Sequence, residues 1–274
     1  SSIVVEYYEP AGSEFPGELE INSVTHGYRD AFSYAKAFGQ AGWCNVNVAC
    51  DIALPWQNQI DAVVMMVVGS NGFCTGALVN NTSFNGRPLV LSANHCLRDP
   101  STVVFWFNWQ SAACANPSVS PPHDALSGAV TRARSSLTDF WLLELNHEVP
   151  VAYRPYYAGW NRSLESGMGG PIIGIHHPRG DIKKFSYAQG VTAAAYLQDS
   201  GVGSSHWRVV WSGGTTTEGG SSGSPVFYSS GRIIGQLHGG WAACGNTDPD
   251  WYGRFGLSWT GGGNPTNRLS DWLD

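Results

Sequence analysis

Three side chains, far apart in the sequence, are of the types that perform nucleophilic catalysis: His95, Asp139 and Ser222. A serine hydroxyl is a weak nucleophile at neutral pH. It needs a base within hydrogen-bond reach, and that base needs a partner that fixes its tautomer. Glycines flank the serine in Gly219–Pro225, and they leave room for backbone N–H groups to turn toward a developing oxyanion. These residues predict acyl-transfer chemistry.

Each of these segments has a simpler interpretation when it is taken alone. A Gly/Ser run is usually a surface loop, an Asp before an apolar run usually belongs to a turn, and a His beside a Cys is usually structural. The order His, Asp, Ser, with spacings of 44 and 83 residues and Cys96 directly after the His, favours the joint interpretation. An esterase on an α/β-hydrolase fold requires the order Ser, Asp, His and is disfavoured.

The elements that must hold these side chains are predicted to be strands. Short apolar runs are broken by Gly, Asn, Pro or Ser at intervals of about eight to twelve residues, which favours a sandwich or barrel. Long helices do not alternate with the strands, so a parallel α/β fold is disfavoured. The tail 267–274 has helical spacing and predicts a short C-terminal helix. The predicted strands are Ser1–Tyr8, Glu18–Val24, Ala62–Val68, Gly76–Val79, Leu89–Leu91, Val103–Trp106, Phe140–Leu145, Ile172–Ile175, Trp207–Trp211, Pro225–Phe227 and Ile233–Leu237, and 28–38 is a short helix or a loop.

Composition narrows the class of protein. The 274 residues carry 15 basic and 21 acidic side chains, a net charge of −6, and no basic cluster exceeds Lys183-Lys184. Nucleic acid and anionic membranes are therefore disfavoured as partners. The longest purely apolar run, Ala62–Val68, is far shorter than the roughly 20 residues of a membrane-spanning helix. The even number of six Cys favours disulfides and an oxidising, extracellular compartment.

The sequence also lacks the motifs of a metal centre. No C-x-x-C or H-E-x-x-H motif accompanies the cysteines and histidines, so a zinc site is disfavoured. We expect no metal and no cofactor, and we interpret His176 and His177 as a loop pair.

Several motifs match one known family in the correct order. They are Val79–Thr82, Ala93–Cys96, Asp139–Asn146, Ile175–Asp181 with Lys183-Lys184, Gly220–Pro225, Gln236–Gly240, Trp259–Gly263 and Arg268–Leu273. On these residues the chain resembles the bacterial lysyl endopeptidases and the related protease IV group, within the trypsin/chymotrypsin superfamily. The resemblance covers about residues 27–274. It implies a secreted, extracellular bacterial serine endopeptidase, which we expect to be a monomer.

The resemblance implies an all-β fold of two antiparallel six-stranded β-barrels, with the catalytic groups in the cleft between them. Residues 44–150 would form the first barrel, with His and Asp. Residues 151–274 would form the second, with Ser and the C-terminal helix. Residues 1–43 would be an N-terminal extension, in which residues 1–26 are either a retained propeptide piece or part of the mature enzyme.

The resemblance also implies a role for each site residue. His95 would be the general base, Asp139 its partner and Ser222 the nucleophile. The backbone N–H groups of Gly220 and Ser222 would form the oxyanion hole, and Gly239 would pair with the substrate backbone as an added strand. The six cysteines allow 15 pairings, and the residues alone choose none. By resemblance the pairs are Cys44–Cys244, Cys50–Cys114 and Cys74–Cys96.

One acidic residue is expected to decide specificity. A pocket for a cationic side chain needs a buried carboxylate at its base. The family's pocket aspartate precedes an aromatic-Gly-Arg strand, which points to Asp250 in Asp250–Arg254. The loop after Cys244 is short, so Asp248 is a second candidate. The alternative is that both aspartates merely flank Pro249 in a turn.

His238 matches a family position where an imidazole near the triad stacks with a Trp. Here the partner position falls near Gln198, with Tyr196 close by. A buried His with no catalytic part is the alternative. The residue before Ser222 is Ser221, which carries no charge. We therefore expect Ser221 or local loop hydrogen bonds, rather than an N-terminal ion pair, to order the oxyanion hole.

The leading hypothesis is an endopeptidase that cuts protein or peptide substrates after Lys, with Arg as a further candidate. A catalytically silent protease-like binding protein is the alternative from another class. Such proteins usually lack one member of the triad, whereas all three are present here. A trypsin-like protease of another primary specificity is the third hypothesis.

Overall fold

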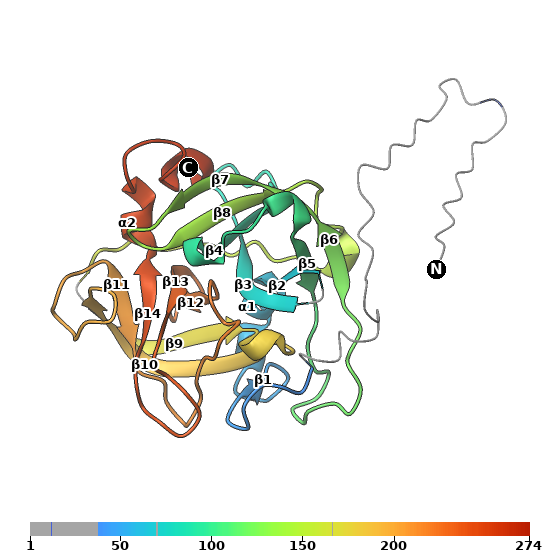
Figure 1. Ribbon diagram of the computed structural model, residues 1–274, viewed down its shortest axis with the longest axis horizontal. Coiled ribbons are helices and arrows are strands. Elements are labelled where there is room, and N and C mark those ends of the chain that lie inside the picture. The colour runs from blue at the N-terminus through green and yellow to red at the C-terminus, as the bar shows by residue number, and fades with distance from the viewer. Residues whose placement is uncertain (1–11, 13–37, 70, 166) are drawn as a thin grey trace.

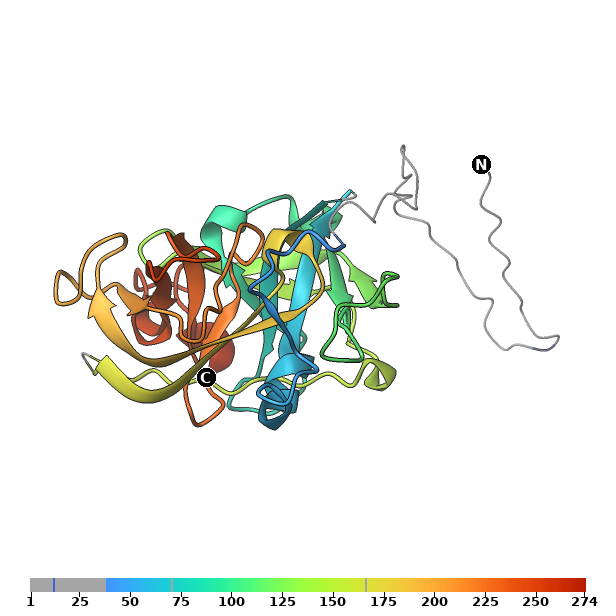
Figure 2. The ribbon, with the colours of Figure 1, turned by 90° about the horizontal axis from the view of Figure 1, so that it is seen from below.

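The computed structural model describes residues 12, 38–69, 71–165 and 167–274. The strands predicted at 1–8 and 18–24, and the helix or loop at 28–38 apart from its last residue, lie outside them. The described residues form two antiparallel β-sheets (Figure 1). Figure 2 shows the two sheets side by side, one with cyan to green strands and the other with yellow to red strands.

The first sheet has seven strands in the order β6-β5-β2-β3-β4-β8-β7. Its edge strands β6 and β7 are joined through the single residue Gly128, which has φ +78°. A Cβ at this position would lie 2.5 Å from Nδ2 of Asn146, so only glycine fits the corner. The sheet consequently curls toward a ring. Its strands are β2 Val63–Val68, β3 Asn71–Val79, β4 Leu89–Ala93, β5 Val104–Phe107, β6 Asp124–Ser127, β7 Ala129–Ser135 and β8 Phe140–Leu145.

The second sheet is a closed barrel of six strands, because β9 pairs with both β10 and β12. A seventh strand, β1, adds to the outer edge of β10. The expectation of a two-barrel all-β fold is confirmed, with one barrel closed by six strands and the other a curled sheet of seven. The strands are β1 Val46–Asn47, β9 Gly167–His176, β10 Lys184–Ala194, β11 His206–Val209, β12 Pro225–Phe227, β13 Ile233–Gly240 and β14 Asp250–Arg254.

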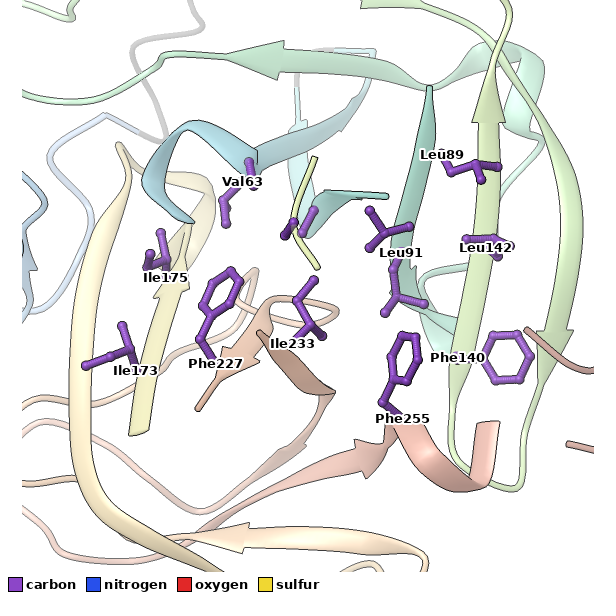
Figure 3. Close-up of a cluster of buried hydrophobic side chains, with 14 of the residues drawn as sticks. Val63, Leu89, Leu91, Phe140, Leu142, Ile173, Ile175, Phe227, Ile233 and Phe255 are labelled. Atoms are coloured by element: carbon purple, nitrogen blue, oxygen red, sulfur yellow. The ribbon is translucent and has the colours of Figure 1, made fainter. Parts of the chain in front are cut away.

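A shared hydrophobic core joins the two sheets (Figure 3). Strand β8 lies between two hydrophobic cores, which explains why its sequence is apolar at nearly every position. Phe140 and Leu142 face the shared core, whereas Trp141, Leu143 and Leu145 face a second core inside the first sheet. Because side chains alternate across a strand, a strand between two cores is buried on both faces.

The two ends of the described chain cross between the sheets. Strand β1 precedes the whole first sheet in sequence but pairs with the second. Conversely, Leu269 and Leu273 follow the second sheet but pack in the core with Val79 and Leu89 of the first. The predicted C-terminal helix is confirmed as α3, Ser270–Leu273. The other helices are α1 Gln57–Ala62, α2 Phe255–Thr260, and the 3₁₀ turns η2 Leu54–Trp56, η3 Asn94–Cys96, η4 Pro100–Thr102, η5 Val151–Tyr153 and η6 Pro178–Gly180. Among the described helices, none is long and apolar enough to span a membrane.

Candidate active site

His95 and Asp139 meet at the end of the first sheet. His95 lies in η3, directly after β4, and Asp139 directly precedes β8, which pairs with β4. Asp139 Oδ1 accepts the backbone N–H of His95 at 2.9 Å, and Asp139 Oδ2 lies 2.7 Å from His95 Nδ1. The carboxylate accepts from Nδ1–H, which leaves Nε2 as the basic nitrogen. Asp139 is buried, whereas the side chain of His95 is 39% exposed.

Residues of the second sheet contact the turn that carries Asp139. Asp139 has φ +57°, a left-handed conformation that Asp tolerates better than most residues. The carbonyl of Thr138 accepts a hydrogen bond from Gln236 Nε2 at 2.6 Å. A Cβ on Gly253 would lie 1.7 Å from the same carbonyl, so glycine in β14 permits the close contact. The Asp139 turn is therefore held by residues of both sheets.

The Ser222 loop packs against the same end of the first sheet, on strands β3 and β4. The backbone N–H of Thr75 donates to the Ser222 carbonyl at 2.8 Å, and Thr75 neighbours Cys74, which is bonded to Cys96. Gly223, at φ +80°, packs so closely that a Cβ would lie 2.2 Å from Ser92 Oγ. Because Ser92 stands three residues before His95, the loop brings Ser222 to the part of the sheet that carries His95.

Besides Gly219, two described residues of this loop leave their backbone N–H groups free. The N–H groups of Ser221, Gly223 and Ser224 donate to carbonyl groups within 2.9 Å. Among the described residues, neither Gly220 nor Ser222 donates its N–H to any acceptor. Gly220 has φ +90° and would clash with Gly180 N at 2.8 Å if it carried a Cβ. The two free donors are the pair expected to bind an oxyanion.

Ser221 is buried and belongs to a chain of neutral hydrogen bonds. The Ser186 hydroxyl donates to the Thr216 carbonyl at 2.6 Å, so it accepts from His176 Nε2–H at 3.0 Å. His176 Nδ1 then accepts from the Ser221 hydroxyl at 2.7 Å. Ser221 in turn accepts the N–H of Glu218 at 3.1 Å. Burial lowers the pKa of His176 to about 3, so the imidazole stays neutral.

The interpretation of His176 and His177 as a loop pair is wrong. His176 ends β9, and both imidazoles are fully buried. His177 Nδ1 lies 2.8 Å from the carbonyl of Asp181, and burial lowers its pKa well below the ordinary value. No signal in the sequence indicates the burial of His176, because its partner Ser221 stands 45 residues away in the chain.

Asp250 and Asp248 have different surroundings. Asp248 is exposed and accepts from Asn246 Nδ2 at 2.8 Å within a turn. Asp250 is 1% exposed, and its Oδ2 accepts from Trp211 Nε1 and the Thr217 hydroxyl, each at 2.7 Å. Burial raises its pKa, against the opposing effect of these donors.

A glycine packs directly against Asp250. Gly240 lies opposite Asp250 in the β13–β14 pair. A Cβ on Gly240 would lie 2.3 Å from Asp250 Oδ1 and 2.4 Å from the Pro249 carbonyl, so any other residue here would clash. Gly239, next to it, has φ +150° and a register shift in the same pair.

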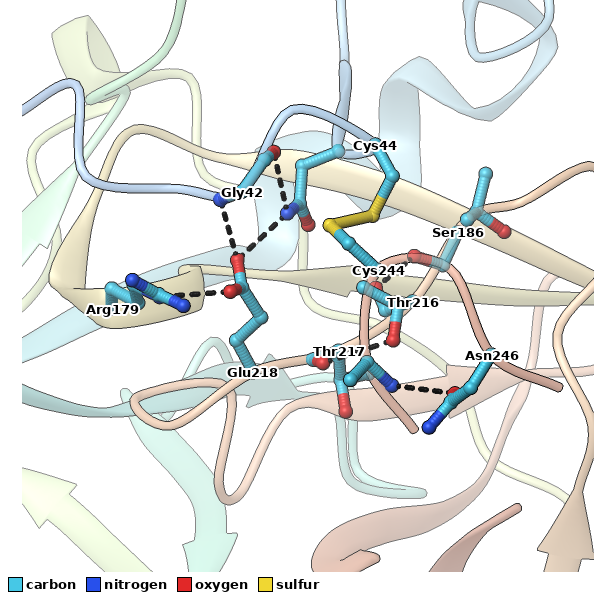
Figure 4. The surroundings of a disulfide bond; sticks show 12 residues. Gly42, Cys44, Arg179, Ser186, Thr216, Thr217, Glu218, Cys244 and Asn246 are labelled. Atoms are coloured by element: carbon cyan, nitrogen blue, oxygen red, sulfur yellow. Dashed lines mark hydrogen bonds and ion pairs between the residues drawn. A yellow bond between two sulfur atoms is a disulfide. The ribbon is translucent and has the colours of Figure 1, made fainter. Parts of the chain in front are cut away.

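A disulfide ties this region to the start of the described chain (Figure 4). Cys44 is bonded to Cys244, and Glu218 Oε2 accepts the N–H of Gly42 and Asn45 Nδ2, each at 2.8 Å. Arg179 Nε donates to Glu218 Oε1 at 2.8 Å. The segment before β1 is therefore fastened to the residues that precede Ser222. The other two disulfides are Cys50–Cys114 and Cys74–Cys96, so the three pairs are those that the resemblance implies.

Comparison of the sequence with known proteins identifies the family of the chain. The model of the lysyl endopeptidase C-terminal domain matches residues 38–253. The chain belongs to the lysyl endopeptidase family. A lysyl endopeptidase of Pseudomonas aeruginosa is 32% identical over 89% of this chain. The chain spans about half of that relative, 56% of its length. This membership confirms the resemblance drawn from the sequence motifs.

Two solved structures of the Mycobacterium tuberculosis protease Rv3671c, both in the inactive form and one a serine-to-alanine mutant, are also similar. Their sequences are 13% and 14% identical to this chain, with TM-scores of 0.47 and 0.49. The similarity covers 72% and 74% of this chain and 83% and 90% of the other.

In this member of the lysyl endopeptidase family, Tyr196 rather than Gln198 stacks on His238. The two rings are 3.6 Å apart between centroids and inclined by 6°. Gln198 instead accepts from Trp251 Nε1 through its backbone carbonyl. Donor atoms of His95, Asp139 and His238 lie within 4.8 Å of one another, a set that could hold a metal ion. The hydrogen bond between His95 and Asp139 already engages two of them.

Proposed function

We propose that the protein is a secreted serine endopeptidase that hydrolyses peptide bonds after Lys, with Arg as a second substrate. The observation that carries the proposal is the convergence of three groups at one end of strands β3, β4 and β8 of the first sheet. They are the hydrogen-bonded pair of His95 and Asp139, the loop of Ser222, and the free N–H groups of Gly220 and Ser222. All three are required for acyl transfer by a serine.

In the proposed mechanism, the Ser222 hydroxyl attacks the scissile carbonyl and its proton passes to His95 Nε2. Asp139 holds the imidazole by Nδ1–H and stabilises the imidazolium. The N–H groups of Gly220 and Ser222 bind the oxyanion of the tetrahedral intermediate. His95 then protonates the leaving amine, and an acyl-enzyme remains. Water, deprotonated by His95, attacks the acyl-enzyme and releases the carboxylic acid.

Lys specificity is supported by the surroundings of Asp250. The carboxylate accepts hydrogen bonds from neutral donors, and no described Lys, Arg or His forms an ion pair with it. A substrate ammonium would supply the missing cation. Asp248, exposed in its turn, is the weaker candidate. In the same proposal Gly239 pairs with the substrate backbone.

The remaining parts of the proposal concern the setting. Three disulfides among the described cysteines support an oxidising, extracellular location. Protein or peptide chains with an accessible Lys are the proposed partners, and the enzyme is proposed to act as a monomer.

Digestion of a denatured protein, followed by sequencing of the fragment ends, tests the proposal. We expect new carboxyl ends at Lys, fewer at Arg, and none at neutral residues. Ser222→Ala should lose about a million-fold in turnover, because the triad acts as a unit. Ser83→Ala, on the exposed surface, is the matched control. Peptide binding without cleavage by the unaltered chain would favour the silent binding protein instead, and fragment ends at other residues would refute the Lys pocket.

A further inference from the structure

A second line of imidazoles ends at Asp139. His238 Nε2 lies 3.7 Å from Asp139 Oδ2, too far for a direct hydrogen bond but close enough for an electrostatic contact. Its Nδ1 lies 3.0 Å from His206 Nε2, and His206 Nδ1 lies 2.8 Å from the Ser205 hydroxyl. His206 is buried at the start of β11, and His238 lies on β13. The proposed triad requires neither of them.

The hydrogen-bond donors and acceptors along this line follow from the carboxylate of Asp139, at which the line ends. Asp139 accepts two hydrogen bonds from His95 and is an acceptor only. A lone pair of His238 facing the carboxylate would be repelled, which favours the tautomer with the hydrogen on Nε2 and with Nδ1 as the acceptor. His206 must then donate from Nε2 and accept at Nδ1 from the Ser205 hydroxyl. Each polar hydrogen in the line points toward Asp139.

We propose that His206 is a positioning residue that holds His238 in the Nε2–H tautomer. Asp139 then faces two imidazoles, of which only His95 can take up a proton during turnover. The inference rests on the proposed function, because it assigns His95 the role of general base.

The groups around His238 explain why a second cation must be prevented. Asp139, His95, Tyr196 and His206 are the titratable groups that face it. Protonation of His238 at Nδ1 would point two N–H groups at each other across 3.0 Å. An imidazolium beside Asp139 would also neutralise the charge that stabilises protonated His95, and so would make that base weaker.

The pKa values agree with this arrangement. Burial lowers the pKa of His238, and the proximity of His95 lowers it further, against the opposing effect of Asp139. Burial, together with His238, lowers the pKa of His206 to about 3. Both shifts favour the neutral form of the two imidazoles.

Two variants separate hydrogen bonding from packing at this position. His206→Phe keeps a ring but removes the donor, whereas His206→Gln retains an N–H near the place of Nε2. The imidazole ¹⁵N shifts of His238 report its tautomer without any substrate. We expect a single Nε2–H form in the unaltered chain and in His206→Gln, and a mixture in His206→Phe. His147→Phe, at an exposed position, is the control.

The pH profile of kcat/KM on a Lys peptide gives the second readout. We expect a one-proton acid limb in the unaltered chain and in His206→Gln. In His206→Phe the limb should approach two protons, with a loss of about tenfold at pH 6 that shrinks toward pH 8. A purely structural effect would lower the rate equally at every pH.

Three outcomes would overturn the inference. They are a single tautomer of His238 in His206→Phe, an unchanged acid limb, and an Nδ1–H tautomer in the unaltered chain. If His206→Phe does not fold, Ser205→Ala removes the donor to Nδ1 and should produce the same mixture to a smaller extent. An unaltered chain that cuts no peptide would refute the proposed function, while the ¹⁵N shifts would still decide the tautomer.

Discussion

Asp139 and Asp250 are both almost completely buried, at 2% and 1% exposure, yet their partners differ. Asp139 accepts one hydrogen bond from the backbone N–H of His95 and one from its imidazole, a group that can become a cation. Asp250 receives its hydrogen bonds from Trp211 and Thr217, which cannot. A buried carboxylate is costly unless a positive charge accompanies it. The chain itself holds the cation for one aspartate, and the proposed substrate brings it for the other.

The largest expected loss of activity follows from removing the charge of Asp139. Asp139→Asn should lower kcat by about 10⁴-fold, because an amide leaves the imidazole free to adopt the wrong tautomer. The loss should be equal for Lys substrates and for esters of neutral amino acids, since the base serves every substrate. Steady-state rates on both substrate types measure it. A loss confined to Lys substrates would mean that Asp139 acts in recognition.

Removing the charge of Asp250 should have the opposite selectivity. Asp250→Asn should lower kcat/KM on Lys peptides by on the order of 10³-fold, because the ammonium would enter the pocket unpaired. Hydrolysis of esters of neutral amino acids should change little. Asp248→Asn is the matched control, two residues away and exposed. If Asp248→Asn loses Lys cleavage and Asp250→Asn retains it, the pocket has been assigned to the wrong aspartate.

A third experiment concerns a part of the site that has no charge. His176 is hydrogen-bonded to Ser186 and to Ser221, the residue before the proposed nucleophile, and in the proposed function these neutral bonds order the loop of the nucleophile. Ser221→Ala should lower kcat by about tenfold, because Glu218 N–H and His176 Nδ1 lose a buried partner. KM should change little.

Acetylation of the α-amine tests the same loop from another side. It should leave the rate on a small peptide unchanged, and a large loss of rate would mean that an ion pair with the α-amine orders the loop of Ser222.

The smallest expected effect is on stability. Burial raises the pKa of Asp250 above its ordinary value of 3.8, so the unfolded chain releases this proton before the folded chain does. The contribution of Asp250 to stability is present below pH 3.8 and is lost as the pH rises through its folded pKa. The Tm of Asp250→Asn minus that of the unaltered chain should therefore increase by a few degrees from pH 3.5 to 6. A difference that is independent of pH would contradict the raised pKa.

Much of the strand pattern could be predicted because burial on both faces gives continuous apolar runs. Phe140–Leu145 and Pro225–Phe227 match β8 and β12 at both ends. Strands β7 and β10 were missed, since each contains charged or small residues among its apolar ones. Lys184, in β10, is buried through Asn47 and Asn116, partners more than 60 residues away. No local pattern reveals such a pairing.

The site divides in the same way. His95, Asp139 and Ser222 could be proposed from the sequence, because serine catalysis demands those residue types in a recognisable order. His176 and His206 were not found, because each acts through hydrogen bonds that depend on strand register. The stacking partner of His238 was predicted near Gln198 and proved to be Tyr196, two positions away. The uncertainty lay in the loop after β10, where spacing alone does not fix which side chain points inward.

The exchange of chain ends between the two sheets has a consequence for folding. Strand β1 completes the second sheet from the beginning of the described chain, and Leu269 and Leu273 complete the core of the first from its end. During synthesis the first sheet emerges long before the residues that seal it, so neither half can reach its final packing alone. Contacts of such sequence separation slow folding. They also couple the halves, so denaturation should follow one cooperative transition rather than two.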